Sequence, residues 1–349
     1  MARRLLVGVG IVLLAVGGWY VWLLNAAGQF KTLAPHFDGT CTAVDGVVGA
    51  EDLTIHPRTG VVYLSSCDRR AVFAGGPAHG AIFAYDLKAP GARPVNLTPD
   101  AGPDFCPHGI SLYVAPDGAS TLFVIVHTRG RSTIEIYDAA ATALTHRATL
   151  SDPLLVAPND LLAASPTQVY VTNDHRYAAG FMRTVEDYTR RPWANVVLWD
   201  GHGFREAADR IRLANGINMS PDGTTVYVAA TIGQAIREYD RNPVSGALRY
   251  RDEIPVGTGV DNIETAADGS LWIGAHPQLL TLVGYMGGRK PQAPSQILHV
   301  TPRAGGGDVE EAYLDLGDHL SAASVGAVYE RHLLIGPIAD TKFLDCVRR

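Results

Sequence analysis

Two acidic residues stand side by side at the start of a strand that the sequence predicts to be buried. In the segment VVGAEDLTIHPRTGVVYLSS, residues 47–66, Glu51 and Asp52 precede an alternating apolar stretch, a turn and a second apolar run. Carboxylates are almost never fully buried unless they are paired or bound to a metal ion. The adjacent pair therefore indicates a site at which two carboxylates are needed together.

Polar residues occupy the comparable position in front of four further apolar strands. They are His108-Gly109-Ile110, Asn159-Asp160, Asn215-Gly216 and Asp261-Asn262, and the sixth position holds Ser324-Val325-Gly326. This set offers carboxylate and amide oxygens, no thiolate and at most one imidazole. Such hard ligands select calcium, which takes about six to eight oxygens, whereas zinc prefers nitrogen and sulfur.

The spacing of these ligands bears on how many ions they would hold. Neighbouring residues in a strand point to opposite faces, so the adjacent pairs at 51–52, 159–160 and 261–262 would serve two different ions. Without a cation, crowded carboxylates would repel one another and raise one another's pKa. A polar channel filled with water is the alternative interpretation.

The elements that carry these residues repeat six times. A turn followed by an apolar strand begins near residues 56, 115, 165, 220, 266 and 329, at intervals of roughly 45–63 residues. Most copies are followed by another strand, as in NVVLWDGH from residue 195, and the turns are rich in Pro, Asp and Gly. This pattern predicts an all-β fold, a six-bladed β-propeller, in which the first strand of each unit lines a central channel. One further helix is expected between Phe181 and Trp193.

The N-terminus carries a hydrophobic segment. Arg3 and Arg4 precede an uncharged run from Leu5 to Leu24. About 20 residues can span the ~30 Å core of a bilayer, whereas a signal peptide has a shorter apolar region of roughly 7–15 residues. We therefore expect residues 1–27 to be an uncleaved signal-anchor and residues 28–349 to form the propeller. The positive-inside rule places the propeller on the periplasmic or extracellular side of a single-pass protein. Cleavage near Asn25-Ala26-Ala27 and a buried core helix are the alternatives.

The four cysteines are compatible with that compartment. They form no CxxC pair, which disfavours structural zinc, and an oxidising compartment permits disulfides. Cys41 precedes the first repeat and Cys346 follows the last, so a bridge between them would close the propeller. It would add roughly 4–5 kcal/mol to stability in the chain-entropy model. Cys67 and Cys106 either pair with each other or are free.

Composition and missing motifs exclude several functions. The net charge of −6 provides no basic surface, so no nucleic-acid partner is expected. The chain has no GxSxG nucleophile motif, no phosphate-binding loop and no dinucleotide fingerprint. The sequence gives no indication of the oligomeric state.

Ten short motifs between about Cys41 and Cys346 together identify a family. They are GAEDLTIHP, PHGISLY, STIEIYD, NDLLA, TNDH, ANGINMSPDG, VDNIE, LWIGAHP, ASVGAVY and LLIG. In order and spacing the chain resembles the paraoxonase/arylesterase family of six-bladed, calcium-dependent lactonases. The resemblance implies hydrolysis of lactones and aryl esters as small-molecule substrates, two bound calcium ions and a disulfide between the chain ends.

The resemblance also implies a role for individual residues. His108 matches the family's proposed general base and His127 its dyad partner, a role that suits a histidine because its pKa lies near neutral. Asp261 is an alternative base, and calcium would polarise the carbonyl group. The ligands of the catalytic ion would be Glu51, Asn159, Asn215, Asp261 and Asn262. Those of the structural ion would be Asp52, Asp160 and the backbone carbonyl of Ile110.

The chain also departs from the family pattern. Ala275 stands where the family has a free cysteine, and the segment from Ala178 to Trp193 is more charged than a lipid-binding helix. Substrate choice and lipoprotein binding are therefore not implied. The alternatives are a gluconolactonase-like or strictosidine-synthase-like propeller with another substrate, and a propeller that binds a ligand without catalysis.

Overall fold

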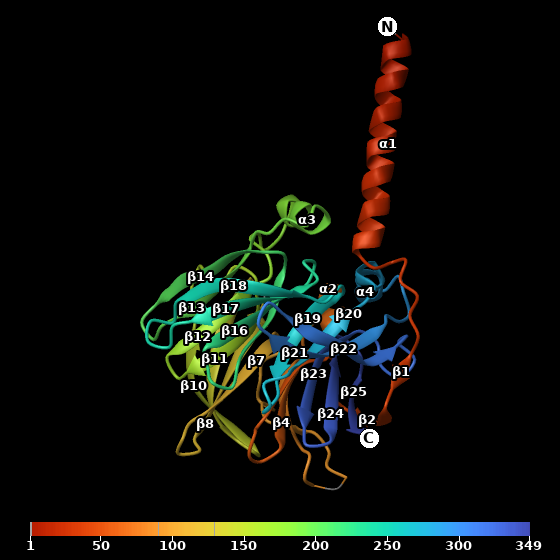
Figure 1. Cartoon of the computed structure of the whole chain (residues 1–349). Helices are drawn as coiled ribbons and strands as arrows, with labels where there is room; N and C mark the ends of the chain where they lie inside the picture. The colour runs from red at the N-terminus through yellow and green to blue at the C-terminus, as the bar shows by residue number, and fades with distance from the viewer. Residues whose placement is uncertain (1, 90, 129) are drawn as a thin grey trace.

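The chain forms a six-bladed β-propeller beneath a long N-terminal helix (Figure 1). The computed structural model describes residues 2–89, 91–128 and 130–349. Each blade is an antiparallel sheet, and neighbouring inner strands contact one another in a closed ring of β3, β7, β11, β15, β19 and β23. The predicted fold class is confirmed.

The blades are numbered by their inner strands in chain order. Blade 1 consists of β3 (Ala50–Ile55), β4 (Val61–Ser66), β5 (Ala81–Asp86) and β6 (Val95–Asn96). Blade 2 consists of β7 (Cys106–Val114), β8 (Ser120–Thr128), β9 (Arg131–Ala140) and β10 (Ala143–Leu150). Blade 3 consists of β11 (Pro158–Ser165), β12 (Gln168–Asn173), β13 (Ala194–Trp199) and β14 (Phe204–Ile211).

The second half of the ring has the same plan. Blade 4 consists of β15 (Ala214–Met219), β16 (Thr225–Ala230), β17 (Ala235–Arg241) and β18 (Leu248–Pro255). Blade 5 consists of β19 (Gly259–Thr265), β20 (Leu271–His276), β21 (Ser295–Arg303) and β22 (Gly306–Asp315), with β1 (His36–Phe37) at its edge. Blade 6 consists of β23 (Ala323–Tyr329), β24 (His332–Pro337), β25 (Lys342–Arg348) and β2 (Gly39–Asp45).

Blade 6 closes the ring with strands from both ends of the chain. Strand β2 pairs with β25, and Cys41 lies directly opposite Cys346 in that pairing. The two cysteines form a disulfide that spans 305 residues of sequence. Apolar side chains of adjacent blades pack between the sheets, for example Phe123 of blade 2 with Leu161 and Val171 of blade 3. The core is therefore divided into layers between blades, and the axis is left to polar residues.

The described part of the chain has four helices beside the propeller blades: α1 (Ala2–Ala26), α2 (Arg69–Phe73), α3 (Phe181–Tyr188) and α4 (Leu279–Met286). The short helices α2, α3 and α4 lie at the end of the propeller from which α1 projects (Figure 1). Helices α1 and α3 were predicted, whereas α2 and α4 were not. The expectation of a single soluble helix was wrong because α2 has five residues and α4 is apolar without a polar face, so neither shows a helical period.

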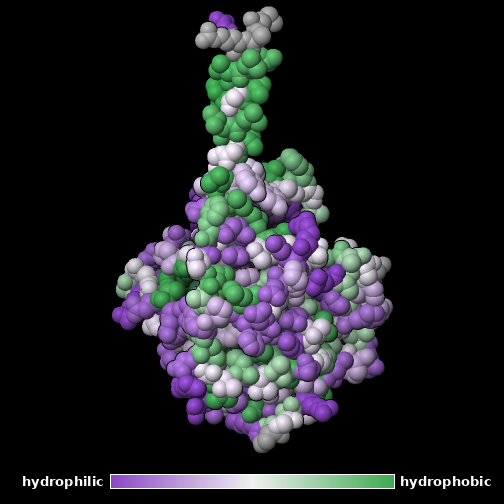
Figure 2. All heavy atoms as spheres, turned by 90° about the vertical axis from the view of Figure 1, so that its right-hand side faces the viewer, coloured by the Kyte–Doolittle hydropathy of each residue, from purple (hydrophilic) through white to green (hydrophobic). Residues whose placement is uncertain are grey.

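Helix α1 is long and apolar enough to cross a membrane between Arg4 and Ala26. Figure 2 shows it as an apolar stalk above a mostly polar propeller surface. Its lower end is docked on the propeller, because Leu23 and Ala27 are buried there. Gln234 Nε2 donates a hydrogen bond to the Ala26 carbonyl at 2.8 Å, and the Leu279 amide donates to the Ala27 carbonyl at 3.0 Å.

Candidate active site

All six inner strands are irregular at the positions that carry the polar residues. The pairing register shifts in β3 at 50–52, in β7 at 107–110, in β11 at 158–161, in β15 at 214–217, in β19 at 260–263 and in β23 at 323–325. Such bulges re-aim side chains and are common next to active sites. Gly109 and Gly216 permit the strands to approach here, since a Cβ on either would lie within 2.6 Å of backbone atoms of the next inner strand.

The first residues of the predicted pairs face a common cavity. Glu51, Asn159, Asn215 and Asp261 all line it, and all four are buried. Glu51 Oε2, Asn159 Oδ1, Asn215 Oδ1 and Asn262 Oδ1 accept no hydrogen bond from any residue that the structure describes. Buried oxygens without a donor are costly, so a cluster of four fits a bound cation.

The second residues of the pairs reach across to other blades. Asp52 Oδ2 accepts a hydrogen bond from the Ile110 amide at 2.7 Å, and Asp160 Oδ2 accepts one from the Ile217 amide at 2.8 Å. Asn262 Nδ2 donates to Glu51 Oε1 at 2.9 Å. Ile110 therefore provides its amide to Asp52, and its carbonyl as a ligand stays a prediction.

His108 lies between Glu51 and His127. Its Nδ1 is 2.9 Å from His127 Nε2, and its Nε2 is 3.3 Å from Glu51 Oε2. His127 Nδ1 is in turn 2.9 Å from Ser132 Oγ. These contacts link Ser132 to Glu51 through both imidazole rings, and only one nitrogen of each neutral ring carries hydrogen.

A third histidine belongs to the site and was not predicted. His276 Nε2 lies 2.6 Å from Asp261 Oδ2, and both side chains are buried. His276 ends β20, as His127 stands near the end of β8, so both histidines are on the second strand of a blade beside its inner strand. That repeated position was the available sequence signal. Arg69, 3.6 Å from Glu51, had no such signal because only the tertiary fold brings α2 to β3.

Burial and neighbouring charges shift the acidity of the site. Burial alone would raise the pKa of Glu51, but His108, Arg69 and Asn262 outweigh it and lower that pKa to about 2. Burial raises the pKa of Asp52 well above its ordinary value, with repulsion from Asp160 and Glu51 in the same direction. Burial also raises the pKa of Asp160 and of Asp261. Burial, together with the nearby His108 and Arg69, lowers the pKa of His127 to about 3, which keeps it neutral.

The cavity above this floor has a volume of about 680 Å³ and an apolar wall. Much of the wall comes from the base of α1 and from α4. These two elements contribute Leu23, Ala26, Ala27, Leu279, Leu280, Leu282, Val283 and Met286, and other segments add Phe73, Leu213, Ile232 and Ile338. A ligand here would place a polar group on the floor and an apolar group against the helices, as binding pockets commonly do.

A second wall of the cavity is charged, and His175 links two of its carboxylates. His175 Nδ1 contacts Asp174 Oδ1 and its Nε2 contacts Asp187 Oδ1 of α3, both at 2.7 Å. Burial would lower the pKa of His175, but these two carboxylates outweigh it and raise the pKa to about 9. The segment from Ala178 to Trp193 thus covers one side of the cavity, with Arg183 and Arg190 on its lining.

The sequence matches the Arylesterase family over residues 41–346. Serum paraoxonase/arylesterase 2 of Rattus norvegicus is 31% identical over 310 residues, which cover 85% of this chain and 86% of that protein. The protein of the same name from Homo sapiens is 30% identical over 355 residues, covering 97% of this chain and 98% of that one. The chain belongs to the arylesterase family. The matched region of this arylesterase contains every polar residue of the floor and begins and ends at the cysteines that close the propeller.

Solved structures share the fold with this arylesterase at low sequence identity. A luciferin-regenerating enzyme superposes with a TM-score of 0.56 at 11% identity, covering 88% of this chain and 95% of that one. A putative gluconolactonase superposes with a TM-score of 0.53 at 16% identity, covering 89% and 93%. These likenesses establish the propeller fold.

Proposed function

We propose that the protein hydrolyses lactones and aryl esters, with calcium bound at the channel floor and His108 as the general base. The observation that carries the proposal is a cluster of four buried oxygens without a hydrogen-bond donor, three of which belong to residues that line the cavity beside the His108 imidazole. Membership of the Arylesterase family and relatives named paraoxonase/arylesterase support the reaction class.

The donor set on the floor fits calcium. Carboxylate and amide oxygens are the ligands that calcium prefers, and the catalytic set would be Glu51, Asn159, Asn215, Asp261 and Asn262. When bound, calcium would supply a Lewis acid that stabilises negative charge on the substrate's carbonyl oxygen. Asp52 and Asp160, with the Ile110 carbonyl, would hold a second, structural ion. Each carboxylate oxygen that accepts one amide hydrogen bond keeps a further lone pair for this purpose.

His108 is better placed than Asp261 to remove a proton from water. Asp261 is engaged by His276 at 2.6 Å, whereas His108 Nε2 lines the cavity floor at 3.3 Å from Glu51. His127 would hold the His108 ring at Nδ1 and stay neutral, since its own pKa is low. A general base in this position contributes about 10²–10⁴-fold to the rate.

The N-terminal helix and the disulfides support a membrane topology for the protein. Residues 1–27 would form a single-pass anchor and residues 28–349 a catalytic unit on the periplasmic or extracellular side, with Arg3 and Arg4 in the cytoplasm. The support is the apolar helix Arg4–Ala26 and two disulfides, which persist in oxidising compartments. Protease added to spheroplasts, which lack an outer barrier, should digest the propeller, and a propeller that is digested only after the spheroplasts are lysed would contradict this topology.

The experiment that tests the function uses the full chain in detergent with phenyl acetate and a panel of lactones. We expect turnover with calcium and none in excess EDTA. Glu51→Gln should lower calcium affinity by at least about 10–100-fold, the range seen for residues that support a metal site. Glu310→Gln, an exposed matched control, should leave calcium affinity unchanged.

Three other outcomes of this experiment would favour different functions or contradict the proposal. Full activity in EDTA would contradict the proposal. Turnover of sugar lactones alone would indicate a gluconolactonase-like enzyme. Calcium binding without any turnover on the panel would favour a propeller that binds a ligand without catalysis.

A further inference from the structure

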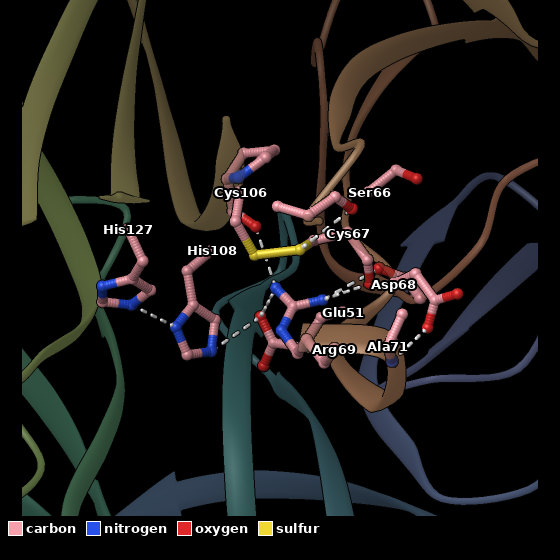
Figure 3. Close-up of a disulfide and its surroundings, with 12 residues drawn as sticks. Glu51, Ser66, Cys67, Asp68, Arg69, Ala71, Cys106, His108 and His127 are labelled. Atoms are coloured by element: carbon pink, nitrogen blue, oxygen red, sulfur yellow. Dashed lines mark hydrogen bonds and ion pairs between the residues drawn. A yellow bond between two sulfur atoms is a disulfide. The ribbon is translucent and has the colours of Figure 1, made fainter. Parts of the chain in front are cut away.

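A second disulfide joins blades 1 and 2 beside the candidate active site (Figure 3). Cys67 follows the last residue of β4, and Cys106 is the first residue of β7, 39 residues later. Both cysteines are buried and pack with Ala78 in a small cluster of their own. Unlike the Cys41–Cys346 bridge, this one lies inside the ring of blades and next to catalytic groups.

The Cys106 end of the bridge holds the strand that carries His108. Cys106 pairs with His127 across β7 and β8, and His108 follows two residues later. Residues 97–105, which lead into β7, contain no helix or strand. The covalent bond therefore fixes the start of β7 at the point where an irregular connection enters the site.

The Cys67 end holds Arg69. Asp68 caps α2 by accepting a hydrogen bond from the Ala71 amide at 2.9 Å, which sets the first turn of the helix. Arg69 Nη1 then donates to the Gly49 carbonyl at 3.1 Å, and Nη2 donates to the Pro107 carbonyl at 2.9 Å. Nη2 is also 3.6 Å from Glu51 Oε2. The guanidinium is buried, and it contacts Gly49, Pro107 and Glu51. Arg69 is therefore suited to hold these residues in position.

Cys67–Cys106 and Arg69–Pro107 are thus two consecutive links between the same two segments, and the next residue along β7 is His108. Figure 3 shows the disulfide, the guanidinium and the two histidines side by side. His108 itself is held by two side-chain contacts, to Glu51 and to His127. A displacement of about 1 Å in such a group can cost about 10²-fold in rate.

We propose that the Cys67–Cys106 disulfide and Arg69 form a clamp that positions His108 against Glu51 and His127. The catalytic part of this inference rests on the proposed function, in which His108 is the base. The competing explanation is that the bridge only stabilises the fold by restricting the unfolded chain, as any disulfide does. The two explanations differ in what the enzyme loses when the bridge is removed.

The test compares two variants that each lack one bridge. Cys67→Ala/Cys106→Ala removes the clamp, and Cys41→Ala/Cys346→Ala removes a bridge in blade 6 that touches no residue of the site. For the full chain in detergent we would measure kcat, KM, the calcium midpoint and Tm, all at a temperature well below both Tm values. The clamp variant should lose at least about tenfold in kcat with KM and calcium midpoint changed less than twofold. The blade 6 variant should keep its kcat.

Arg69→Lys extends the test to the second link. Lysine keeps the charge beside Glu51, but its single ammonium group cannot reproduce the planar fork that spans the two carbonyls. Residues that act through one shared element give non-additive effects. We therefore expect the combination of Arg69→Lys with the clamp variant to lower kcat little more than the clamp variant alone.

Several results would overturn the proposal. An unchanged kcat in the clamp variant, or equal losses in both disulfide variants, would leave only a stabilising role. A calcium midpoint that shifts in step with kcat would assign the effect to the metal site. If the wild type turns over no substrate, the proposed function fails, but crystal structures of wild type and clamp variant still decide the positioning. The clamp requires the 2.9 Å contact between His108 and His127 to be lost in the variant, and an intact contact would refute it.

Discussion

At the scale of single residues, Glu51 is the point on which the site converges. Its carboxylate contacts His108, Arg69 and Asn262, and its backbone carbonyl accepts a hydrogen bond from Ser324 Oγ at 2.6 Å. These neighbours come from blades 2, 1, 5 and 6, so Glu51 contacts residues of four of the six blades. The network explains how a carboxylate stays ionised while it is buried.

His108→Gln is expected to lower kcat by about 10²–10⁴-fold, because glutamine cannot take a proton from water. Calcium affinity should stay close to that of the wild type, since His108 is outside the proposed ligand set. Steady-state rates and calorimetric titration with calcium measure the two effects. His127→Gln serves as the comparison and should have a smaller effect on kcat. A fully active His108→Gln enzyme would remove His108 from the mechanism.

His175 should make stability depend on pH. Its folded pKa of about 9 lies above the ordinary value of about 6.5. The charged form therefore contributes stability that is complete below about pH 6.5 and is lost as pH rises through about 9. The contribution is at most about 3 kcal/mol.

The measurement is the difference in Tm between wild type and His175→Gln across pH 6 to 10. The difference should be largest at pH 6 and vanish near pH 10. His202→Gln, at an exposed turn, is the matched control and should show no difference at any pH. A His175→Gln deficit that is constant with pH would contradict the ion-pair account.

At the scale of elements, α1 has two parts with different roles. Its upper turns are exposed and apolar, as a membrane span requires, whereas its last turn is docked on the propeller and lines the cavity with Leu23. Helix α4 contributes five further apolar residues to that wall. The apolar composition of α4 fits this position, because five of its apolar side chains line the cavity, although Val283 is also 45% exposed.

Two truncated chains separate these roles. A chain that begins at Trp22 keeps the last turn of α1, whereas one that begins at Gln29 loses Leu23, Ala26 and Ala27 from the wall. Burial of a leucine side chain is worth about 1.5–3 kcal/mol, so KM for an apolar lactone should rise about tenfold in the shorter chain only. A small polar lactone is the control substrate. Equal KM values for both chains with the apolar lactone would show that α1 does not contribute to binding.

At the scale of the whole molecule, the closing blade holds the ring together. Strand β2 comes from the N-terminal side and the other strands of blade 6 from the C-terminal side, so opening this pairing would open the propeller. The ring in turn sets the distances between all inner strands, on which the site depends. Closure is therefore a condition for the site as well as for the fold.

Removal of the Cys41–Cys346 bridge should lower the free energy of unfolding by about 2–5 kcal/mol. Denaturant unfolding of Cys41→Ala/Cys346→Ala with calcium present measures the change. Activity at low temperature should be retained, since neither cysteine of this bridge lines the cavity. A variant as stable as the wild type would show that strand pairing alone closes the ring.

The sequence by itself determined the repeated architecture and most of the channel floor. Turn residues and alternating apolar positions are local signals, so the six units, the helix at Phe181–Tyr188 and the apolar segment that became α1 were all predictable. Because equivalent positions of a cyclic repeat meet at the axis, Glu51, Asn159, Asn215 and Asp261 could be grouped without a structure.

Only the tertiary structure decided the contacts that this repetition does not encode. The pairing of Cys67 with Cys106 and the approach of Arg69 to Glu51 are contacts that have no counterpart in the described part of the other blades. They depend on how α2 leaves β4 and on bulges that turn side chains away from the regular alternation of a strand. The docking of the base of α1 beside α4 could not be predicted from the sequence either. An apolar run predicts burial, but it does not show which element it packs against.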